Sequence, residues 1–188
     1  MDMKKIPVSQ VRRQDRSVED EEWIREMLRR TAVGHLAMAA GEQPYLNTNL
    51  YVLDEAASAI YLHTASEGRT ASAIEQNANV CFSVSEMGRL LPGQSAAEMS
   101  VEYASVIVFG RAERIADPQQ AEQALRLLLA KYFPHFRYGE DYGGIQPADL
   151  ERTAVYRIRI EQWSGKRKKA QPDFPGAFLY GRAGESQT

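Results

Sequence analysis

Residues 61–70 read YLHTASEGRT, and within this stretch the pattern changes from that of a β-strand to that of a helix. The strand pattern ends near His63, and a short helix is expected to begin close to Glu67. Free N–H groups at the start of a helix can bind phosphate, and an arginine adds a forked, charge-assisted contact. The side chains that could converge on one anion are those of Thr64, Ser66, Arg69 and Thr70. A phosphate site and an ordinary capped helix with a solvated arginine both fit this spacing.

Runs of β-forming residues lie on both sides of this junction and are separated by turn-forming sequences. They predict strands at 33–39, 45–53, 58–63, 79–85, 100–115 and 153–163, of which the first three form a meander. Apolar residues at helical spacing predict two further helices, from the cap signal at Ser17 and Asp20 to about Arg30, and from Asp117-Pro118 to about Tyr132. Because this order lacks β–α–β alternation, it predicts a mainly β chain that forms a small antiparallel barrel with flanking helices.

The chain of 188 residues suits one folded domain with extensions at both ends. Residues 1–16 are mostly polar and basic, which predicts an N-terminal arm, and the domain is expected to span 17–166. Residues 167–188 predict a C-terminal tail that runs over the surface or across a partner subunit. Two segments, 87–99 and 133–150, contain several glycine residues and are expected to form loops.

Composition and charge argue against several classes of protein. The 23 basic and 25 acidic residues give a formal charge of −2, which argues against nucleic acid or an anionic membrane as a partner. No run approaches the roughly 18 apolar residues that span a bilayer, and the start lacks a secretory signal, so a cytoplasmic location is expected. The single cysteine, Cys81, shares no metal-ligand spacing with His35 or His135. We therefore predict no metal site and no internal disulfide.

Segments from most of the chain match one family pattern when they are taken in order. The matching segments are Gly34-His35-Leu36-Ala37, Pro44-Tyr45, Tyr61–Ala65 with Gly68-Arg69, Asn77 with Val80-Cys81-Phe82, Ser105–Ala112 and Trp163-Ser164-Gly165-Lys166. Their order and spacing over 33–166 resemble the FMN-binding split β-barrel proteins related to pyridoxamine 5'-phosphate oxidase, nearest to the nitroimidazole-resistance (Nim) branch. The resemblance implies an antiparallel split β-barrel that forms a homodimer with two FMN sites at the subunit interface.

The resemblance also implies which residues would hold FMN. Its phosphate would meet Ser66, Gly68, Arg69 and Thr70. Its ring would lie along Asn47, Thr48, Asn49, Leu50, His63 and Thr64, with Ser105 and Lys166 contributed nearby. Two positions depart from the family pattern, because relatives often have lysine in place of Thr70 and proline in place of Asn49. Lys166 and the basic residues after it could supply the missing charge or could simply be solvated.

His63 is the residue to which the resemblance gives a catalytic role. It would face the flavin, where it could hydrogen-bond a substrate or supply a proton, and a histidine merely packed at a strand end is the alternative. Trp163 could border the flavin or belong to the core. Cys81 lies in an apolar run and is expected to be buried and inert.

The function implied is that of an FMN-dependent oxidoreductase, which takes electrons from a reduced nicotinamide or another flavin and reduces small aromatic or nitro acceptors. Three alternatives stay open. They are a non-enzymatic flavin or haem binding protein or sensor, pyridoxamine-phosphate oxidase activity itself, and a dimer that has lost its cofactor.

Overall fold

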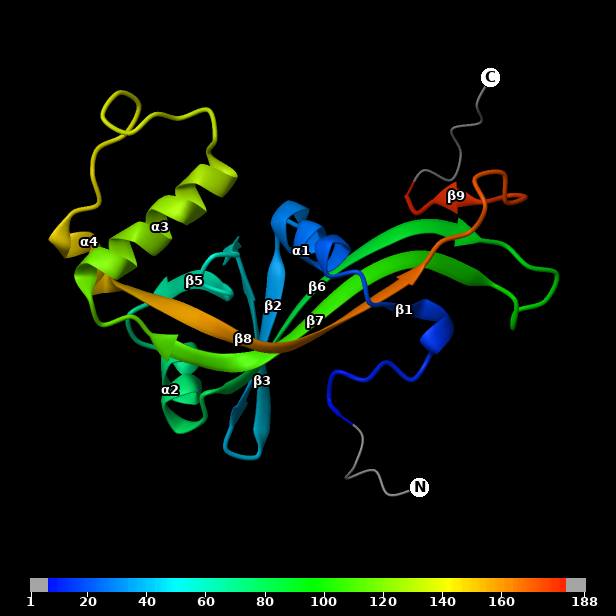
Figure 1. The fold of residues 1–188 in the computed structure, drawn as a ribbon, viewed down its shortest axis with the longest axis horizontal. Coiled ribbons are helices and arrows are strands. Elements are labelled where there is room, and N and C mark those ends of the chain that lie inside the picture. The colour runs from blue at the N-terminus through cyan, green and yellow to red at the C-terminus, as the bar shows by residue number, and fades with distance from the viewer. Residues whose placement is uncertain (1–6, 182–188) are drawn as a thin grey trace.

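The computed structural model describes residues 7–181. It contains one antiparallel sheet, whose strands differ in length, with four α-helices around it. The strands are β1 (Ser17–Val18), β2 (Gly34–Ala40), β3 (Gln43–Asn49), β4 (Tyr51–Asp54), β5 (Ala59–Ala65), β6 (Asn79–Leu91), β7 (Ser100–Arg114), β8 (Thr153–Lys168) and β9 (Phe178–Leu179). The helices are α1 (Glu21–Arg30), α2 (Arg69–Gln76), α3 (Pro118–Tyr132) and α4 (Pro147–Arg152), preceded by a 3-10 turn at Gln14–Arg16. Helices α3 and α4 lie at one end of the molecule, and β9 with the far ends of β6 and β7 lies at the other (Figure 1).

The sheet closes on itself through Leu50. Its strand order is β3-β2-β6-β7-β8-β5-β4, with β1 added to β8 and β9 added to β6. The two strands at the ends of this order, β3 and β4, follow each other in the chain and are separated by Leu50 alone. One residue can join them only if the sheet curls until its edges meet, yet no hydrogen-bonded ladder links β3 to β4 within residues 7–181. The result is an antiparallel barrel that is split along this seam.

The prediction of one strand over 45–53 within a meander is therefore wrong. Strand β3 pairs with β2, and β4 pairs with β5, so the chain leaves one edge of the sheet and joins the other at Leu50. The residues on both sides favour β structure, and nothing in their local pattern shows that the ladder changes between them.

The barrel interior is filled by alternate residues of the long strands and by one face of α1. Large side chains that are almost completely buried include Ile24, Met27, Leu28, Leu36, Tyr51, Ile60, Leu62, Phe82, Val84, Val106, Tyr156 and Ile158. Gly34 permits the closest approach in this core, because a Cβ at that position would lie 2.0 Å from Cζ of Phe82. A side chain there would displace the aromatic ring, so the close packing of β2 on β6 requires glycine.

Helix α3 covers the outer face of the barrel near β5 and forms a second apolar cluster. Its residues Ala121, Ala124 and Leu128 pack against the strand residues Val52, Tyr61 and Val155. The apolar stripe that predicted this helix is the face that it buries, and the side chain of Asp117 caps its start by accepting the N–H of Gln119 at 3.0 Å.

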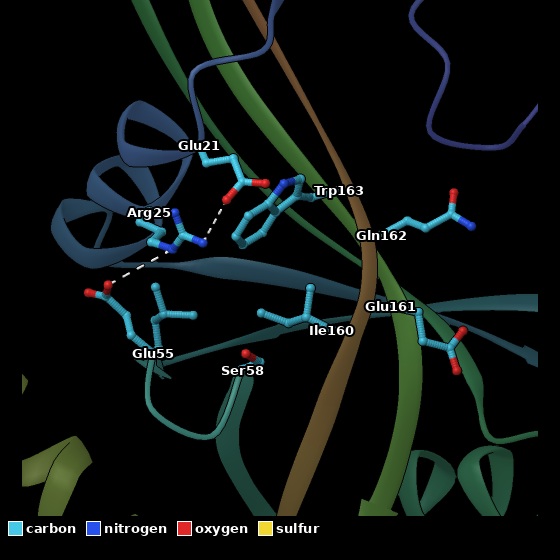
Figure 2. A pocket seen from close by; sticks show the side chains of 9 residues that line it. Glu21, Arg25, Glu55, Ser58, Ile160, Glu161, Gln162 and Trp163 are labelled. Atoms are coloured by element: carbon cyan, nitrogen blue, oxygen red, sulfur yellow. Dashed lines mark hydrogen bonds and ion pairs between the residues drawn. The ribbon is translucent and has the colours of Figure 1, made fainter.

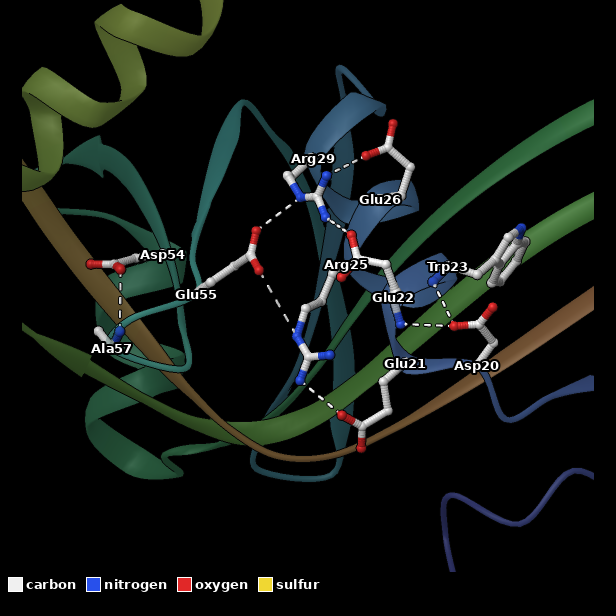
Figure 3. A network of polar contacts seen from close by, with 10 residues as sticks. All are labelled: Asp20, Glu21, Glu22, Trp23, Arg25, Glu26, Arg29, Asp54, Glu55 and Ala57. Carbon is white, nitrogen blue, oxygen red and sulfur yellow. Dashed lines mark hydrogen bonds and ion pairs between the residues drawn. The ribbon is translucent and has the colours of Figure 1, made fainter.

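Helix α1 begins where the sequence predicts, and ion pairs join it to the β4–β5 turn. The N-cap is Asp20, whose carboxylate accepts the N–H groups of Glu22 and Trp23. Figure 3 shows Arg25 and Arg29 reaching from α1 toward Glu55, and Nε of Arg29 lies 2.8 Å from that carboxylate. These pairs are exposed, so each contributes little to stability, and the buried face of the helix holds it in place.

Three predictions of irregular structure are wrong. Strand β6 continues to Leu91, so the loop expected at 87–99 is confined to the residues between Leu91 and Ser100. Strand β8 continues to Lys168 rather than ending near 163, and the segment expected to be a loop over 133–150 ends in the start of α4. Pairing with β7 and β9 stabilises the additional residues of β6 and β8 as strand even though their own propensity for it is low.

Both terminal extensions pack on the sheet in the part that is described. Val11 is buried, and the hydroxyl of Ser9 donates to Oε1 of Gln162 at 2.7 Å. At the other end, Nη1 of Arg89 donates to the carbonyl of Pro172 at 2.7 Å, and β9 pairs with β6. Over residues 7–181, no helix combines the length and hydrophobicity that crossing a bilayer requires.

Candidate functional site

The start of α2 presents uncapped backbone N–H groups. Its N-cap is Gly68, which has φ of 135°, a value that side-chain-bearing residues rarely adopt, and no side chain caps the first turn. The preceding turn is fixed by the N–H of Ser66, which donates to the carbonyl of Arg152 at 3.0 Å. The first N–H groups of a helix have no partner within the helix, so this turn can accept an anion.

A cleft of about 700 Å³ lies in front of this turn. The residues that line it are Ala40, Gln43, Pro44, Tyr45, Gly68, Arg69 and Ser72. The β2–β3 hairpin thus forms one wall and the start of α2 the other. The space around Gly68 is open, since a Cβ there would meet nothing within 4 Å. An exposed guanidinium and free N–H groups beside an open cleft make up a donor set that suits a phosphate.

Strand β3 is tied to the first turn of α2 by polar side chains. Nδ2 of Asn47 donates to Oγ1 of Thr70 at 3.2 Å, and Thr70 is buried. Two residues further along, Oδ1 of Asn49 is buried and accepts no hydrogen bond from the described residues. Thr48 lies on the other face of the strand, where Oγ1 is 3.1 Å from Nδ1 of His35. An unpaired buried side-chain carbonyl is a position at which a ligand N–H can bind.

An apolar pocket of about 280 Å³ lies at the other end of β3. Its lining consists of Leu50, His63, Leu125, Leu128, Leu129, Tyr132, Phe133, Ile145 and Asp149. Leucines of one face of α3 form the floor, and the residues after α3 form a side wall. Desolvation at this pocket lowers the pKa of His63 below its ordinary value, so its imidazole is neutral at pH 7.

Four of the predicted cofactor residues line the cleft or the pocket, and β3 runs between the two. Gly68 and Arg69 line the open cleft, whereas Leu50 and His63 line the apolar pocket. A strand rises about 3.3 Å per residue, so the five steps from Tyr45 to Leu50 span roughly 16 Å. An elongated ligand with an anionic end and a flat ring could lie along this path.

Two predicted residues lie elsewhere in the protomer. Ser105 and Lys166 face each other across β7 and β8, and neither lines the cleft or the pocket. Ser105 also pairs with Ser85 of β6, which places it in the middle of the sheet. These residues do not join the group around α2 within a single protomer.

Some residues near the site are not predicted by the sequence pattern. Arg114 lies at the end of β7, and its Nη1 is 3.4 Å from the carbonyl of Ser66, so it adds a second cation near the turn before α2. The leucines of α3 were predicted as a packing stripe, and their second role as a pocket floor was not. Their place near the site could not be predicted because they lie far from His63 in the sequence and no local motif links them to it.

Trp163 lies in a different pocket, of about 270 Å³, between α1 and β8. Figure 2 shows its indole beside the guanidinium of Arg25, and the carbon of that group is 5.0 Å from the ring centroid. Glu21 and Glu55 line the same pocket and flank the arginine. The protomer thus places Trp163 at the edge of the barrel core under α1, away from His63 and Arg69.

The remaining candidates for reactive chemistry are few. Burial raises the pKa of the Cys81 thiol, as expected for an unreactive cysteine, although its side chain is only half-buried. Among residues 7–181, no group of three or more His, Cys, Asp or Glu side chains is arranged to hold a metal ion.

A barrel split along one seam, with an anion-accepting helix start at one end of its edge strand and an apolar pocket at the other, defines a split β-barrel protein. A family model described as Pyridoxamine 5'-phosphate oxidase matches residues 20–167, so the chain belongs to this family. Comparison with curated proteins finds no significant match.

Solved structures share the fold over most of the chain. The flavocytochrome Anf3 from Azotobacter vinelandii is 25% identical, with a TM-score of 0.77 over 86% of this chain and 74% of that one. An FAD-binding protein from Mesorhizobium loti is also 25% identical, with a TM-score of 0.57 over 82% of this chain and 98% of that one. A putative 5-nitroimidazole antibiotic resistance protein from Bacteroides thetaiotaomicron is 20% identical, with a TM-score of 0.67 over 80% and 86% of the two chains. At that identity the last comparison supports the fold alone.

Proposed function

We propose that the protein is a flavin-binding oxidoreductase, with FMN lying along β3 between the start of α2 and the apolar pocket. The observation that carries this proposal is that β3 runs from the cleft beside Arg69 to the apolar pocket lined by Leu50 and His63. Two solved relatives at 25% identity are described as a flavocytochrome and an FAD-binding protein, which supports a flavin. FMN is preferred because its single phosphate matches the one uncapped helix start in this cleft.

The residues present fit this cofactor. Arg69, the N–H groups after Gly68 and Arg114 would hold the phosphate and replace the charge that Thr70 lacks. The unpaired Oδ1 of Asn49 could accept an N–H from the ring, and Asn47 keeps Thr70 in place. The side chains therefore supply donors at the anionic end and an acceptor along the strand, as an FMN molecule requires.

When bound, the flavin would supply two-electron chemistry, receiving a hydride from a reduced nicotinamide or electrons from another flavin. The protein's own groups would bind and orient the acceptor, exclude water and manage protons. His63 lies at the rim of the pocket as a neutral imidazole, so it can hydrogen-bond an acceptor or pass on a proton. Small aromatic or nitro compounds suit the apolar walls that the leucines of α3 provide.

We also propose that two copies of the chain form a homodimer. One face of the sheet carries small or apolar side chains in register, including Ala37, Cys81 and Phe109 in one row. These side chains are only half-buried, so a second copy could cover them. In such a dimer, Ser105 and Lys166 could reach the cofactor of the partner subunit. The single cysteine suits a reducing cytoplasm.

The test is titration of the flavin-free protein with FMN, followed by absorbance and fluorescence, with FAD as a comparison. Arg69→Ala should weaken FMN binding by roughly 10-fold to 150-fold, because a hydrogen bond to a charged group contributes about 1.5–3 kcal/mol. Arg111→Ala is the matched control, since that exposed arginine bonds Asn79 and lies outside the cleft. Unchanged FMN affinity in Arg69→Ala would refute the phosphate assignment.

His63→Ala separates catalysis from binding. We expect this variant to retain FMN and to reduce an aromatic acceptor more slowly, with a changed dependence of rate on pH. Full activity with an unchanged pH profile would exclude the proposed role of His63.

Haem binding is a second candidate because a neutral imidazole at an apolar pocket has the form of an axial ligand. A Soret band in the purified protein that disappears in His63→Ala would favour it. Pyridoxamine-phosphate oxidation has less support, since no lysine or arginine is among the residues that line the apolar pocket.

A further inference from the structure

The structure assigns the substrate class of the apolar pocket: we propose that it binds an uncharged, flat acceptor of about two fused aromatic rings and excludes phosphorylated ones. The inference rests on the proposed function, because the acceptor is taken to meet the flavin ring at this pocket. The floor is made by Leu125, Leu128 and Leu129, and Leu50 and His63 form the side nearest β3.

Size limits the ligand. The pocket is partly open to solvent and has a volume of about 280 Å³. An engineered protein cavity of about 150 Å³ lined by apolar side chains binds benzene. A pocket almost twice as large suits two fused rings, and it is small for a cofactor or a peptide. Pockets for drug-sized ligands begin near 300 Å³, so the ligand is expected to be compact.

Shape and chemistry limit it further. The leucines of α3 lie on one helical face, so they present a continuous apolar surface to a flat ring. Tyr132 at the end of α3 and Phe133 directly after it continue this surface, where aromatic side chains can contact the edge of the ligand. Hydrophobic burial is then the main source of affinity, with His63 as the polar group that can fix orientation.

Charge excludes anionic ligands. The one charged lining side chain is that of Asp149, whose carboxylate accepts the N–H of Gln146 at 2.9 Å. Arg152 pairs with this carboxylate at 3.9 Å, and its Nε donates to the carbonyl of Ala148 at 3.4 Å. Two other cations of α3 are engaged with other groups. Nζ of Lys131 donates to the carbonyl of Thr31 at 2.9 Å, and Arg126 pairs with Glu122 at 2.7 Å. A phosphate in this pocket would be desolvated without a cation that is free of other partners, which costs several kcal/mol.

The test uses two ligands that share their rings and differ in charge. Calorimetric titration of the flavin-free protein would compare 2-naphthol with 2-naphthyl phosphate. We expect the neutral compound to bind at least about tenfold more tightly, because the charged one buries an unpaired phosphate. Equal affinity, or tighter binding of the phosphate ester, would overturn the proposal.

Variants of α3 test whether the ligand binds in this pocket. Leu129→Trp fills the pocket from a half-exposed position and should weaken 2-naphthol binding by about tenfold or more. Leu127→Trp is the matched control, because it lies on the same helix, is similarly exposed and does not line the pocket. Leu129→Lys should reverse the preference and favour 2-naphthyl phosphate. Unchanged binding in both Leu129 variants would exclude this pocket as the site.

Repeating the titration with saturating FMN separates this inference from the proposed function. Binding of 2-naphthol that persists in the FMN-saturated protein supports an acceptor site beside the flavin. Loss of that binding would show that the flavin itself fills the pocket and would overturn the inference. If 2-naphthol binds with the predicted preference to a protein that takes up no flavin, the pocket assignment stands and the flavin proposal fails.

Discussion

Tyr132→Phe removes one hydroxyl near the point at which the chain passes from β3, at one edge of the sheet, to β4, at the other. That hydroxyl accepts a hydrogen bond from the N–H of Tyr51 at 2.9 Å. It can donate one to the carbonyl of Ala32 at 2.7 Å or to that of Tyr51 at 2.8 Å. It thus joins the end of α3 to the first residue of β4 and to the segment before β2. Tyr51 is completely buried, so its N–H cannot readily bond to water in place of the lost partner.

The expected cost follows from these contacts. Leaving a buried donor without a partner costs about 1–3 kcal/mol, and the two carbonyls lose a donor that only one could use at a time. For a domain of this length each kcal/mol lowers Tm by roughly 2–4 °C, so Tyr132→Phe should unfold roughly 2–12 °C lower. Thermal and urea unfolding by circular dichroism would measure the change, and hydrogen exchange would follow the Tyr51 amide.

The control is Tyr142→Phe, which removes a hydroxyl for which the described residues provide no hydrogen bond and should leave Tm almost unchanged. Faster exchange of the Tyr51 amide in Tyr132→Phe alone would confirm the assigned contact. A free energy of unfolding within about 0.5 kcal/mol of the wild type, with normal protection of that amide, would refute the reasoning.

Three further predictions concern single groups. The pKa of His63 is lowered by burial, so its ¹³C–¹H signals should titrate below pH 6.5, and folding stability should fall as pH drops through that value because the unfolded chain binds the proton more readily. Gly110→Ala would bring a Cβ to 2.0 Å from the carbonyl of Arg159 at the β7–β8 bulge, so urea unfolding should show a loss of about 1–3 kcal/mol or more, and no loss would contradict the close approach. The pKa of Glu102 is lowered to about 2 mainly by the hydrogen bonds of Arg89, so the stability it contributes is present above pH 4.5 and is lost as pH falls toward 2. Hydrogen exchange at the Ala170 amide, which donates to Glu102 at 2.8 Å, should accelerate over that range, and Glu102→Gln should remove the pH dependence.

The candidate site was predictable from sequence where its residues are neighbours in the chain. The turn that carries Gly68 and Arg69 follows a strand and opens a helix, and both elements have strong local patterns. The structure places that turn beside the β2–β3 hairpin and ties it to Asn47 through Thr70. These contacts agree with the sequence-based expectation for the anionic end of the cofactor, which itself stays a prediction.

The other end of the site could not be found in this way. Leu50 and the leucines of α3 are about 75 residues apart in the chain, and only the closure of the barrel brings them to one pocket. The predictions that the site includes Ser105 and Lys166 depend on a second subunit, because in one protomer these residues lie in the middle of the sheet.

The sequence alone determined the class of fold, because apolar periodicity selects strands or helices residue by residue and the capping residues Asp20 and Asp117 fix where two helices begin. The tertiary structure decided the seam at Leu50, the continuation of β6 and β8 beyond their apolar runs, and the apolar pocket. The physical reason is that hydrogen-bonded pairing between distant strands and the packing of α3 on the barrel depend on contacts between residues far apart in the chain, which no local pattern specifies.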